Sequence, residues 1–507
     1  MMLMKSEFKT DLLVIGGGIN GTGVALDAAT RGLDVTLCEA EDLASATSSA
    51  SSKLIHGGLR YLEQYEFKLV KEALHEREIL LKKAPHLIHP LRFVLPYAKH
   101  LRPLWMIRLG MFLYDFLSGK TSLEKSKKIS LKKTLKGESL VDDFQIGFEY
   151  SDCRVDDARL VVLNALQAQQ YGANILLPFR CVSIKKQPDC WLATLTNHRQ
   201  DIITVTAKAI VNAAGPWVAD VIQELKNSHF QSSVKLIKGS HIVIPKLYEG
   251  DHAYILQNKD GRIIFALPYG FTDIHKNDFT LIGTTDIDFH GDPRGVEISD
   301  NERCYLCRLI NRHFKKQIST EDIIWDYAGV RPLYNDHVKN PSKITREYHL
   351  ELKEDNGKHP ILSIFGGKIT TYRTLSQQAV NQLKPFFPKL PESKTYEIPT
   401  LGGDSATFKQ LLQKVKRAYP WLEPSHAYRL SSSYGTLSFK LLGTAKSYRD
   451  LGQCFGFNFY ETEVAYLVKQ EWCHTIEALL WRRTKIGLWL SKAEQTTLSQ
   501  WLAKFTS

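Results

Sequence analysis

The N-terminal segment predicts a strand, a glycine-rich turn, a helix and a second strand, and this order limits the fold more than any other feature. Residues 11–15, apolar after Asp11, predict a short buried strand, a helix rich in small residues follows to Arg31, and 35–37 predict a second strand. Between the first strand and the helix, Gly16, Gly18 and Gly21 have the GxGxxG spacing, which allows a tight turn and lets a pyrophosphate approach the helix N-terminus. Glu39 ends the second strand, where a carboxylate can bind a ribose hydroxyl. The segment therefore predicts a Rossmann-like α/β fold that binds a dinucleotide.

Two later segments repeat this order and favour FAD over NAD. An apolar run at 209–214 ends at Gly215, and another at 361–365 ends at Gly366 and Gly367. A flavin is longer than a nicotinamide cofactor, and its ring must also be held by remote parts of the chain. The helix predicted to open near Thr370 would place positive partial charge where reduced flavin accumulates negative charge.

Composition is that of a folded globular chain. The 507 residues suggest about two to four domains, and 43% hydrophobic with 24% charged residues argues against disorder and against a polytopic membrane protein. We expect no signal peptide, because the first strand begins too early to leave room for one. A net charge of +12 favours an anionic partner.

The cysteines predict neither disulfides nor a metal site. Eight are scattered along the chain, which is typical of a reducing, cytosolic environment. Only Cys304 and Cys307 have ligand-like spacing, and they lack a second pair and lie in a helical pattern. We interpret them as two ordinary thiols.

Residues 47–62, TSSASSKLIHGGLRYL, resemble the FAD-dependent glycerol-3-phosphate dehydrogenases of the bacterial aerobic, respiratory type. The resemblance continues through 147–152, 156–159, 238–241, 283–286, 329–332, 365–368 and 479–485. A small departure is Ala214, where many relatives carry Thr. The resemblance implies oxidation of sn-glycerol 3-phosphate to dihydroxyacetone phosphate, with FAD taking the hydride and a membrane quinone taking the electrons. It also implies a peripheral protein on the cytoplasmic side of the inner membrane, and it allows a homodimer.

Two other functions remain open at this stage. One is an oxidase that gives the same product and passes electrons to oxygen, because oxygen access to a reduced flavin depends on geometry. The other is a non-catalytic, flavin-bearing membrane scaffold.

The resemblance implies a set of site residues whose chemistry fits a phosphate ester. Phosphate binding needs several cations, and Arg offers paired donors in a planar fork; the candidates are Arg60, Arg331, Arg346 and Lys368. The remaining candidates are Tyr61 and Asp286 at the substrate, and Ser48, Ser49 and Lys368 at the cofactor.

Removal of the C2 hydroxyl proton needs a base, for which histidine has a suitable pKa. His56 and His241 both lie in matched motifs, and the sequence does not choose between them. Arg331 is the third predicted catalytic residue.

The glycine-led segments divide the chain into discontinuous parts. We expect an FAD-binding domain at 1–75, 149–230 and 325–388, interrupted by a substrate or interfacial segment at 76–148 and by a substrate domain at 231–324. Alternating runs at 240–244 and 262–266 predict an antiparallel sheet in the substrate domain. A helical C-terminal domain is expected at 389–507.

Basic charge is concentrated between Tyr97 and Lys133, where nine cations oppose only Asp115 and Glu124. The apolar window 104–117 within this stretch is too short to span a bilayer. Together they predict an interfacial element for anionic lipid. The alternative is a core helix followed by a solvated basic loop. No nucleic-acid-binding motif accompanies the charge.

Overall fold

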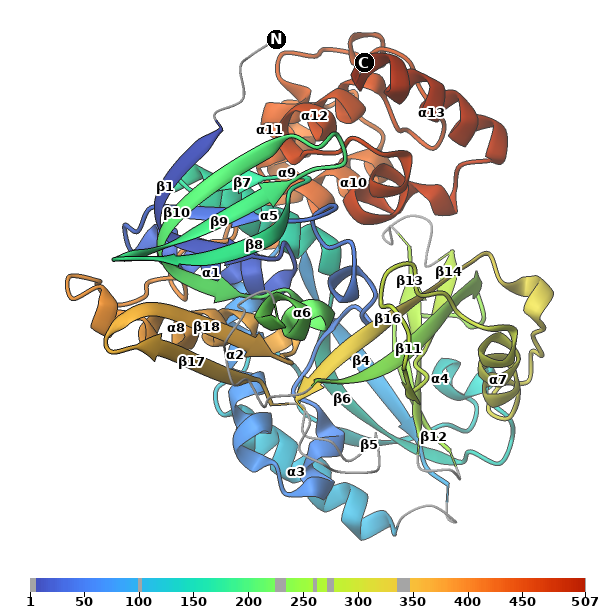
Figure 1. The fold of residues 1–507 in the computed structure, drawn as a ribbon. Helices are drawn as coiled ribbons and strands as arrows, with labels where there is room; N and C mark the ends of the chain where they lie inside the picture. The colour runs from blue at the N-terminus through green and yellow to red at the C-terminus, as the bar shows by residue number, and fades with distance from the viewer. Residues whose placement is uncertain are drawn as a thin grey trace.

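The computed structural model describes residues 6–98, 103–223, 234–258, 262–270, 278–334 and 347–506. It contains two large β-sheets and a group of C-terminal helices (Figure 1). The predicted α/β fold with an antiparallel second sheet and a helical C-terminal region is confirmed.

The first sheet is built around the N-terminal strand. Its strands follow the order β17-β18-β10-β1-β2-β7, and β9 pairs with β10 and β8. The bounds are β1 Glu7–Ile15, β2 Val35–Cys38, β7 Asn174–Leu176, β8 Arg180–Gln187, β9 Cys190–Thr196, β10 Ile202–Asn212, β17 His349–Asp355 and β18 Lys358–Phe365. β1 pairs in parallel with β2 and β10, and β10 with β18. The three predicted glycine-led strands, β1, β10 and β18, are therefore neighbours, and their carboxyl ends lie at the same edge.

Helices cover the parallel strands of this sheet. They are α1 Ile19–Thr30, α5 Asp157–Gln170, α6 Val218–Gln223 and α8 Tyr372–Gln382. The small residues Ala25, Ala28 and Ala29 on α1 are at most 4% exposed, and α1 contacts both α5 and α8. Small side chains allow this close packing, so the alanine-rich pattern after the glycines is explained by the helix–helix contacts.

The second sheet is antiparallel except where β12 pairs with β4. Its strands are β3 Leu54–Ile55, β4 Ile88–Pro96, β5 Lys127–Ser130, β6 Ile146–Val155, β11 Val234–Pro245, β12 Ala253–Gln257, β13 Ile263–Tyr269, β14 Phe279–Gly283, β15 Ile287–Asp288 and β16 Trp325–Tyr334. The helices packed near it are α2 Phe67–Lys83, α3 Leu104–Ser118, α4 Leu135–Glu138 and α7 Asp300–Asn311. The runs predicted as strands at 240–244 and 262–266 lie in β11 and β13.

The domain limits stay a prediction, but three strands pair outside the ranges that suggested them. β3, β16 and most of β6 fall in ranges assigned to the FAD-binding domain, yet all three belong to the second sheet. The hydrogen-bonded registers of β16 with β11, and of β6 with β4 and β3, decide this placement. Such pairing joins distant segments, and local pattern does not reveal it.

The C-terminal helices are α9 Phe408–Ala418, α10 Pro424–Tyr434, α11 Leu437–Leu442, α12 Glu461–Glu471 and α13 Lys492–Thr506. Buried ion pairs connect this region to the segments around the first sheet: Arg159 on α5 bonds Glu471, and Arg483 bonds Asp42 at 2.7 Å. The C-terminal region is thus fixed to the rest of the molecule by charges as well as by apolar contacts.

Candidate active site

A cavity of about 350 Å³ lies at the carboxyl ends of β1 and β10. Its lining includes seven predicted cofactor residues: Gly16, Gly18, Glu39, Ser48, Gly215, Gly366 and Gly367. The glycine turn and the N-terminus of α1 form one wall, as the sequence predicts for a pyrophosphate site.

The turn accepts only glycine at two of its positions. A Cβ on Gly21 would lie 1.9 Å from the carbonyl oxygen of Gly16, and one on Gly16 would lie 2.5 Å from the carbonyl oxygen of Ala213. Gly16 also has a φ of +115°, which side-chain-bearing residues rarely adopt. Gly18 is less crowded, because its Cβ would approach only the Ser48 hydroxyl, at 3.0 Å.

Side chains hold this turn in place. The Gly17 N–H donates to Glu39 Oε2 at 2.6 Å, and the Ile19 N–H donates to Ser48 Oγ at 3.0 Å. Burial raises the pKa of Glu39, whereas its hydrogen bonds from backbone N–H groups oppose that rise. Glu39 therefore orders the turn as well as facing the cavity.

A second cavity, of about 260 Å³, adjoins the first. The two share the wall residues Ile19, Thr47, Ser48, Pro332, Gly366 and Gly367. A long ligand can therefore extend from the glycine turn into the space between the two sheets. The second cavity brings together most of the predicted catalytic and substrate-binding residues: His56, Arg60, Tyr61, Asp286, Arg331 and Lys368.

Arg331 on β16 is held by the loop after β14. Its guanidinium bonds the carboxylate of Asp286 and donates to Thr284 Oγ1 at 3.1 Å. The Arg331 and Asp286 side chains are 22% and 14% exposed, so the pair sits in the cavity wall with limited access to water. This arrangement fixes the planar guanidinium in the cavity wall.

Two further predicted residues that line this cavity contact each other. Lys368 Nζ lies 3.7 Å from the ring centroid of Tyr61, a cation–π contact. Thr370 does not line the cavity and is 1% exposed, but its hydroxyl accepts from the His56 N–H at 3.1 Å. The segments around Thr370 and His56 are thereby fixed to each other.

The two candidate histidines occupy different layers. His56 lines the cavity, whereas His241 is 1% exposed and lies behind Ser52, with its Nε2 2.9 Å from Ser52 Oγ. His241 also stacks on Tyr327, with ring centroids 4.9 Å apart. Burial, followed by the charges of Arg331 and Lys53, holds the pKa of His241 well below its usual value. His241 is therefore neutral at physiological pH.

Sequence reasoning missed four side chains that support this site, although all lie in segments that resemble the family. Ser52 stands between His241 and the cavity, and Asp152 lines the cavity while accepting from the Gly57 N–H at 3.2 Å. Lys53 and Asp157 form a buried ion pair at 2.9 Å beneath the 47–53 loop. Their pairing follows from the fold, because they come from separate segments.

Like Thr370 and His241, the predicted cofactor residues Gly21 and Ser49 line neither cavity. The Ser49 carbonyl accepts from Lys53 Nζ at 2.9 Å. Arg346 lies outside the described residues. Cys304 and Cys307 are on α7 as the helical pattern predicted, and both are free thiols.

Comparison with known proteins agrees with this geometry. Residues 11–373 match the model of the FAD dependent oxidoreductases. The chain belongs to this family. Residues 393–503 of this FAD-dependent oxidoreductase match the C-terminal domain of alpha-glycerophosphate oxidase. The cofactor prediction is confirmed, and the glycine turn, the joined cavities and the glycine-led segment at Gly366 fit FAD.

Several curated proteins are similar to this flavoprotein over nearly their whole length. A glycerol-3-phosphate dehydrogenase of Pseudomonas aeruginosa is 50% identical and covers 97% of this chain and 94% of the relative. The aerobic glycerol-3-phosphate dehydrogenase of Escherichia coli is 47% identical, with 98% of each chain covered. A D-erythritol 1-phosphate dehydrogenase of Brucella abortus is 45% identical, with 97% of each covered.

A solved structure is also similar. The glycerol-3-phosphate dehydrogenase of Bacillus halodurans, complexed with FAD, has a TM-score of 0.77 and 26% identity, covering 99% of this chain and 91% of that one. The resemblance noted from the sequence motifs is confirmed by these comparisons.

Proposed function

We propose that this flavoenzyme oxidises sn-glycerol 3-phosphate to dihydroxyacetone phosphate and passes the electrons to a membrane quinone. The observation that carries the proposal is the second cavity, which adjoins the cavity at the glycine turn. It is lined by Arg60, Arg331, Lys368 and His56. The similarity to proteins named glycerol-3-phosphate dehydrogenase supports this substrate.

The roles of the chain's own residues follow from charge and position. The cations bind the phosphate dianion and orient C2 toward the cofactor end of the cavity. His56 takes the C2 hydroxyl proton as the hydride leaves C2, because it is the candidate histidine on the cavity wall. His241 is a positioning residue that acts through Ser52. Bound FAD supplies the hydride acceptor.

D-erythritol 1-phosphate is the second candidate substrate, since a relative of comparable identity is named for it. It offers the same phosphate and hydroxyl chemistry on a longer carbon chain. The two substrates therefore differ in the length of cavity that they need.

The test is anaerobic addition of each phosphate ester to the purified holoenzyme while flavin absorbance is followed. We expect rapid bleaching with glycerol 3-phosphate and a much higher kcat/KM than with D-erythritol 1-phosphate. The reverse preference would move the assignment to the longer substrate, and no bleaching with either would support a non-catalytic flavoprotein. A quinone analogue is then added, or oxygen in a parallel sample; faster reoxidation by oxygen would indicate an oxidase.

We also propose that α3 docks the protein on an anionic membrane surface on the cytoplasmic side. Within the described residues, no helix is long and apolar enough to cross a bilayer. α3 instead exposes an apolar, mostly aromatic stripe at helical spacing: Trp105, Leu109, Phe112 and Phe116 are 63%, 48%, 63% and 71% exposed.

The opposite face of α3 packs on the protein through Ile107, Met111 and Tyr114. The alternative from the sequence, a core helix followed by a solvated basic loop, accounts for this packed face but not for the exposed one. Exposed Lys120, Lys125 and Lys128 follow the helix and complement anionic headgroups. α3 lies at the end of the molecule opposite the C-terminal helices (Figure 1).

A further inference from the structure

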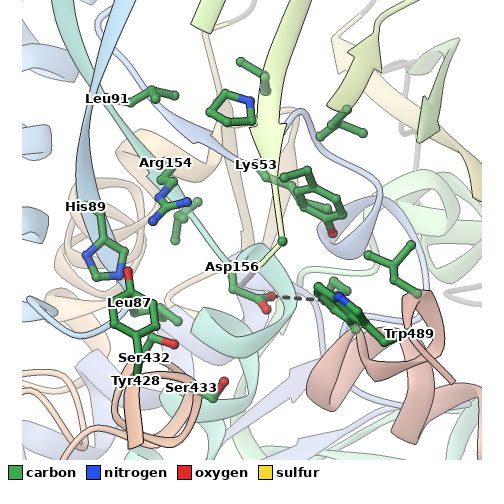
Figure 2. Close-up of a pocket in the computed structure, with 18 residues that line it drawn as sticks. Lys53, Leu87, His89, Leu91, Arg154, Asp156, Tyr428, Ser432, Ser433 and Trp489 are labelled. Carbon is green, nitrogen blue, oxygen red and sulfur yellow. Dashed lines mark hydrogen bonds and ion pairs between the residues drawn. The ribbon is translucent and has the colours of Figure 1, made fainter. Parts of the chain in front are cut away.

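A third cavity, of about 110 Å³, lies between the second sheet and the C-terminal helices (Figure 2). Its lining comes from β4, β6, β13, β14, α10 and the segment before α13. No residue that lines it also lines either cavity of the active site. We call it the interface cavity. A single water molecule needs roughly 10 to 15 Å³ of such volume, so this cavity has room for a small organic molecule.

The walls of the interface cavity are mostly apolar. They are formed by aliphatic and aromatic side chains, chiefly Leu87, Leu91, Val155, Leu267, Leu281, Leu488, Tyr269 and Trp489. The Trp489 indole N–H is already engaged, since it donates to Asp278 at 2.9 Å. Trp489 therefore offers this cavity an apolar face, and the ligand must bring an apolar body to match the walls.

The polar groups of the interface cavity leave a positive charge without a counter-charge. Lys53 is paired with Asp157, and Lys485 is paired with Asp156 at 3.2 Å. Arg154, in contrast, has no hydrogen bond or ion pair with the residues that the structure describes. Figure 2 shows its guanidinium reaching into the cavity beside His89.

The neighbours of Arg154 do not neutralise it. Burial, and then the charge of Arg154 itself, lowers the pKa of His89 to about 3, so the imidazole is uncharged at neutral pH. A polar atom on the same lining also lacks a partner: the Tyr269 hydroxyl is buried and makes no hydrogen bond within the described residues. Burial raises the pKa of Tyr269 well above its usual value, so this hydroxyl remains a donor.

We propose that the interface cavity binds a small monoanionic carboxylic acid with an apolar body. Its carboxylate accepts the two-pronged hydrogen bonds of Arg154, and its body packs against Trp489 and the leucine side chains. A single negative charge matches the single unpaired cation, since the two lysines already have carboxylate partners. The proposal concerns a second site and does not depend on which substrate the flavin site takes.

The interface cavity also borders residues that hold the active-site loop in place. Lys53, on its wall, donates to Ser49 O and lies 4.8 Å from the ring centroid of Tyr327, the residue on which His241 stacks. A ligand here therefore touches the base of the 47–53 loop without entering the flavin cavities.

The test measures binding of benzoate and hexanoate to the FAD-loaded protein by calorimetry, with benzyl alcohol and hexanol as neutral probes of similar shape. We expect saturable binding of a carboxylate, and at least about tenfold weaker binding of the matching alcohol, because a charge-assisted hydrogen bond is lost. Arg154→Gln should weaken carboxylate binding by about tenfold or more. Arg308→Gln, at an exposed position on α7, is the matched control and should bind normally.

A second variant keeps the experiment decisive if Arg154→Gln does not fold. Ser432→Phe places a ring in the interface cavity from α10 and should abolish binding while Arg154 is retained. Unchanged binding in both variants, no saturable binding of either acid, or purely competitive inhibition against glycerol 3-phosphate would overturn the proposal. A co-crystal with 4-iodobenzoate should place its carboxylate against Arg154 and its iodine against the apolar walls.

Discussion

At the scale of single residues, the two candidate histidines differ in what they touch. His56 lines the substrate cavity, whereas His241 reaches it only through the Ser52 hydroxyl. The geometry therefore supplies a preference between two residues that the sequence left equal.

His56→Gln should lower kcat by about 100-fold or more, because proton transfer by a positioned base contributes on that order. His241→Gln should have a smaller effect, similar to that of Ser52→Ala, and the His241→Gln/Ser52→Ala double variant should not add the two losses. The measurement is single-turnover flavin reduction across a pH series. The base would be His241 if His241→Gln slowed flavin reduction more than His56→Gln did. In that case the rate in His241→Gln should also no longer fall at low pH.

Arg331→Lys tests the planar fork rather than the charge. The variant keeps a cation but cannot bond Asp286, Thr284 and substrate with the same geometry. We expect kcat/KM to fall by a factor equivalent to about 1.5 to 3 kcal/mol while the flavin stays bound. Steady-state dye reduction measures this, with Arg308→Lys as control. A near-normal value would remove Arg331 from the site.

At the scale of elements, the β1–turn–α1 unit depends on the absence of side chains. Gly21→Val should give a protein without flavin, since even the first carbon would lie 1.9 Å from the Gly16 carbonyl oxygen. Absorbance of the purified protein gives the flavin content. Gly110→Ala, where an added Cβ meets nothing within 4 Å, should stay fully yellow. Stoichiometric flavin in Gly21→Val would defeat the assignment of this turn to the cofactor.

α3 is an element with two apolar faces, of which one packs on the described part of the protein and the other is exposed there. Replacing Trp105, Phe112 and Phe116 together with Ser should release the protein from anionic vesicles while glycerol 3-phosphate oxidation by a soluble dye persists. For the unchanged protein, salt should weaken vesicle binding without abolishing it, because apolar burial is not screened.

Vesicle co-sedimentation measures this binding. Tyr171→Ser, at an aromatic residue that is 45% exposed elsewhere, is the matched control. Unchanged co-sedimentation of the triple variant would place the membrane contact in another region. Loss of dye reduction together with vesicle binding would instead show that these α3 side chains are needed for the protein to fold.

At the scale of the whole molecule, buried neutral histidines predict loss of stability in acid. His86 is fully buried, and neither of its ring nitrogens has a hydrogen-bond partner in the described parts of the chain. Burial, followed by the charge of Arg159, lowers the pKa of His86 from 6.5 to about 3. Between these values the unfolded chain binds the proton and the folded chain does not, so stability falls as the pH falls.

His86→Leu should reduce the loss of unfolding free energy between pH 7 and pH 5 by about 2 kcal/mol. Urea denaturation at the two pH values measures the difference. His198→Gln, at an exposed histidine, should leave the loss unchanged. An equal acid loss in His86→Leu and the unchanged protein would contradict the role of His86.

The sequence by itself determined the local units. A strand followed by GxGxxG and an alanine-rich helix has few stable conformations, because Gly16 and Gly21 remove clashes with the backbone that any side chain would create. β10 and β18 are recognisable from the glycines that follow them, Gly215, Gly366 and Gly367, because all three adopt a positive φ that favours glycine. The motifs also identified residues around the substrate cavity, since a phosphate ester needs cations and its oxidation needs a base.

Only the tertiary structure decided which of these units meet. Placement of β16 and β6 in the second sheet depends on pairing between distant segments, whose register has no local signature. The same is true of side chains. Lys53 pairs with Asp157 and His241 hydrogen-bonds with Ser52, whereas Arg154 has no partner within the described residues. Charge and residue type are properties of the sequence, but burial and pairing come from the packing of distant elements, and these decide which groups are available to a ligand.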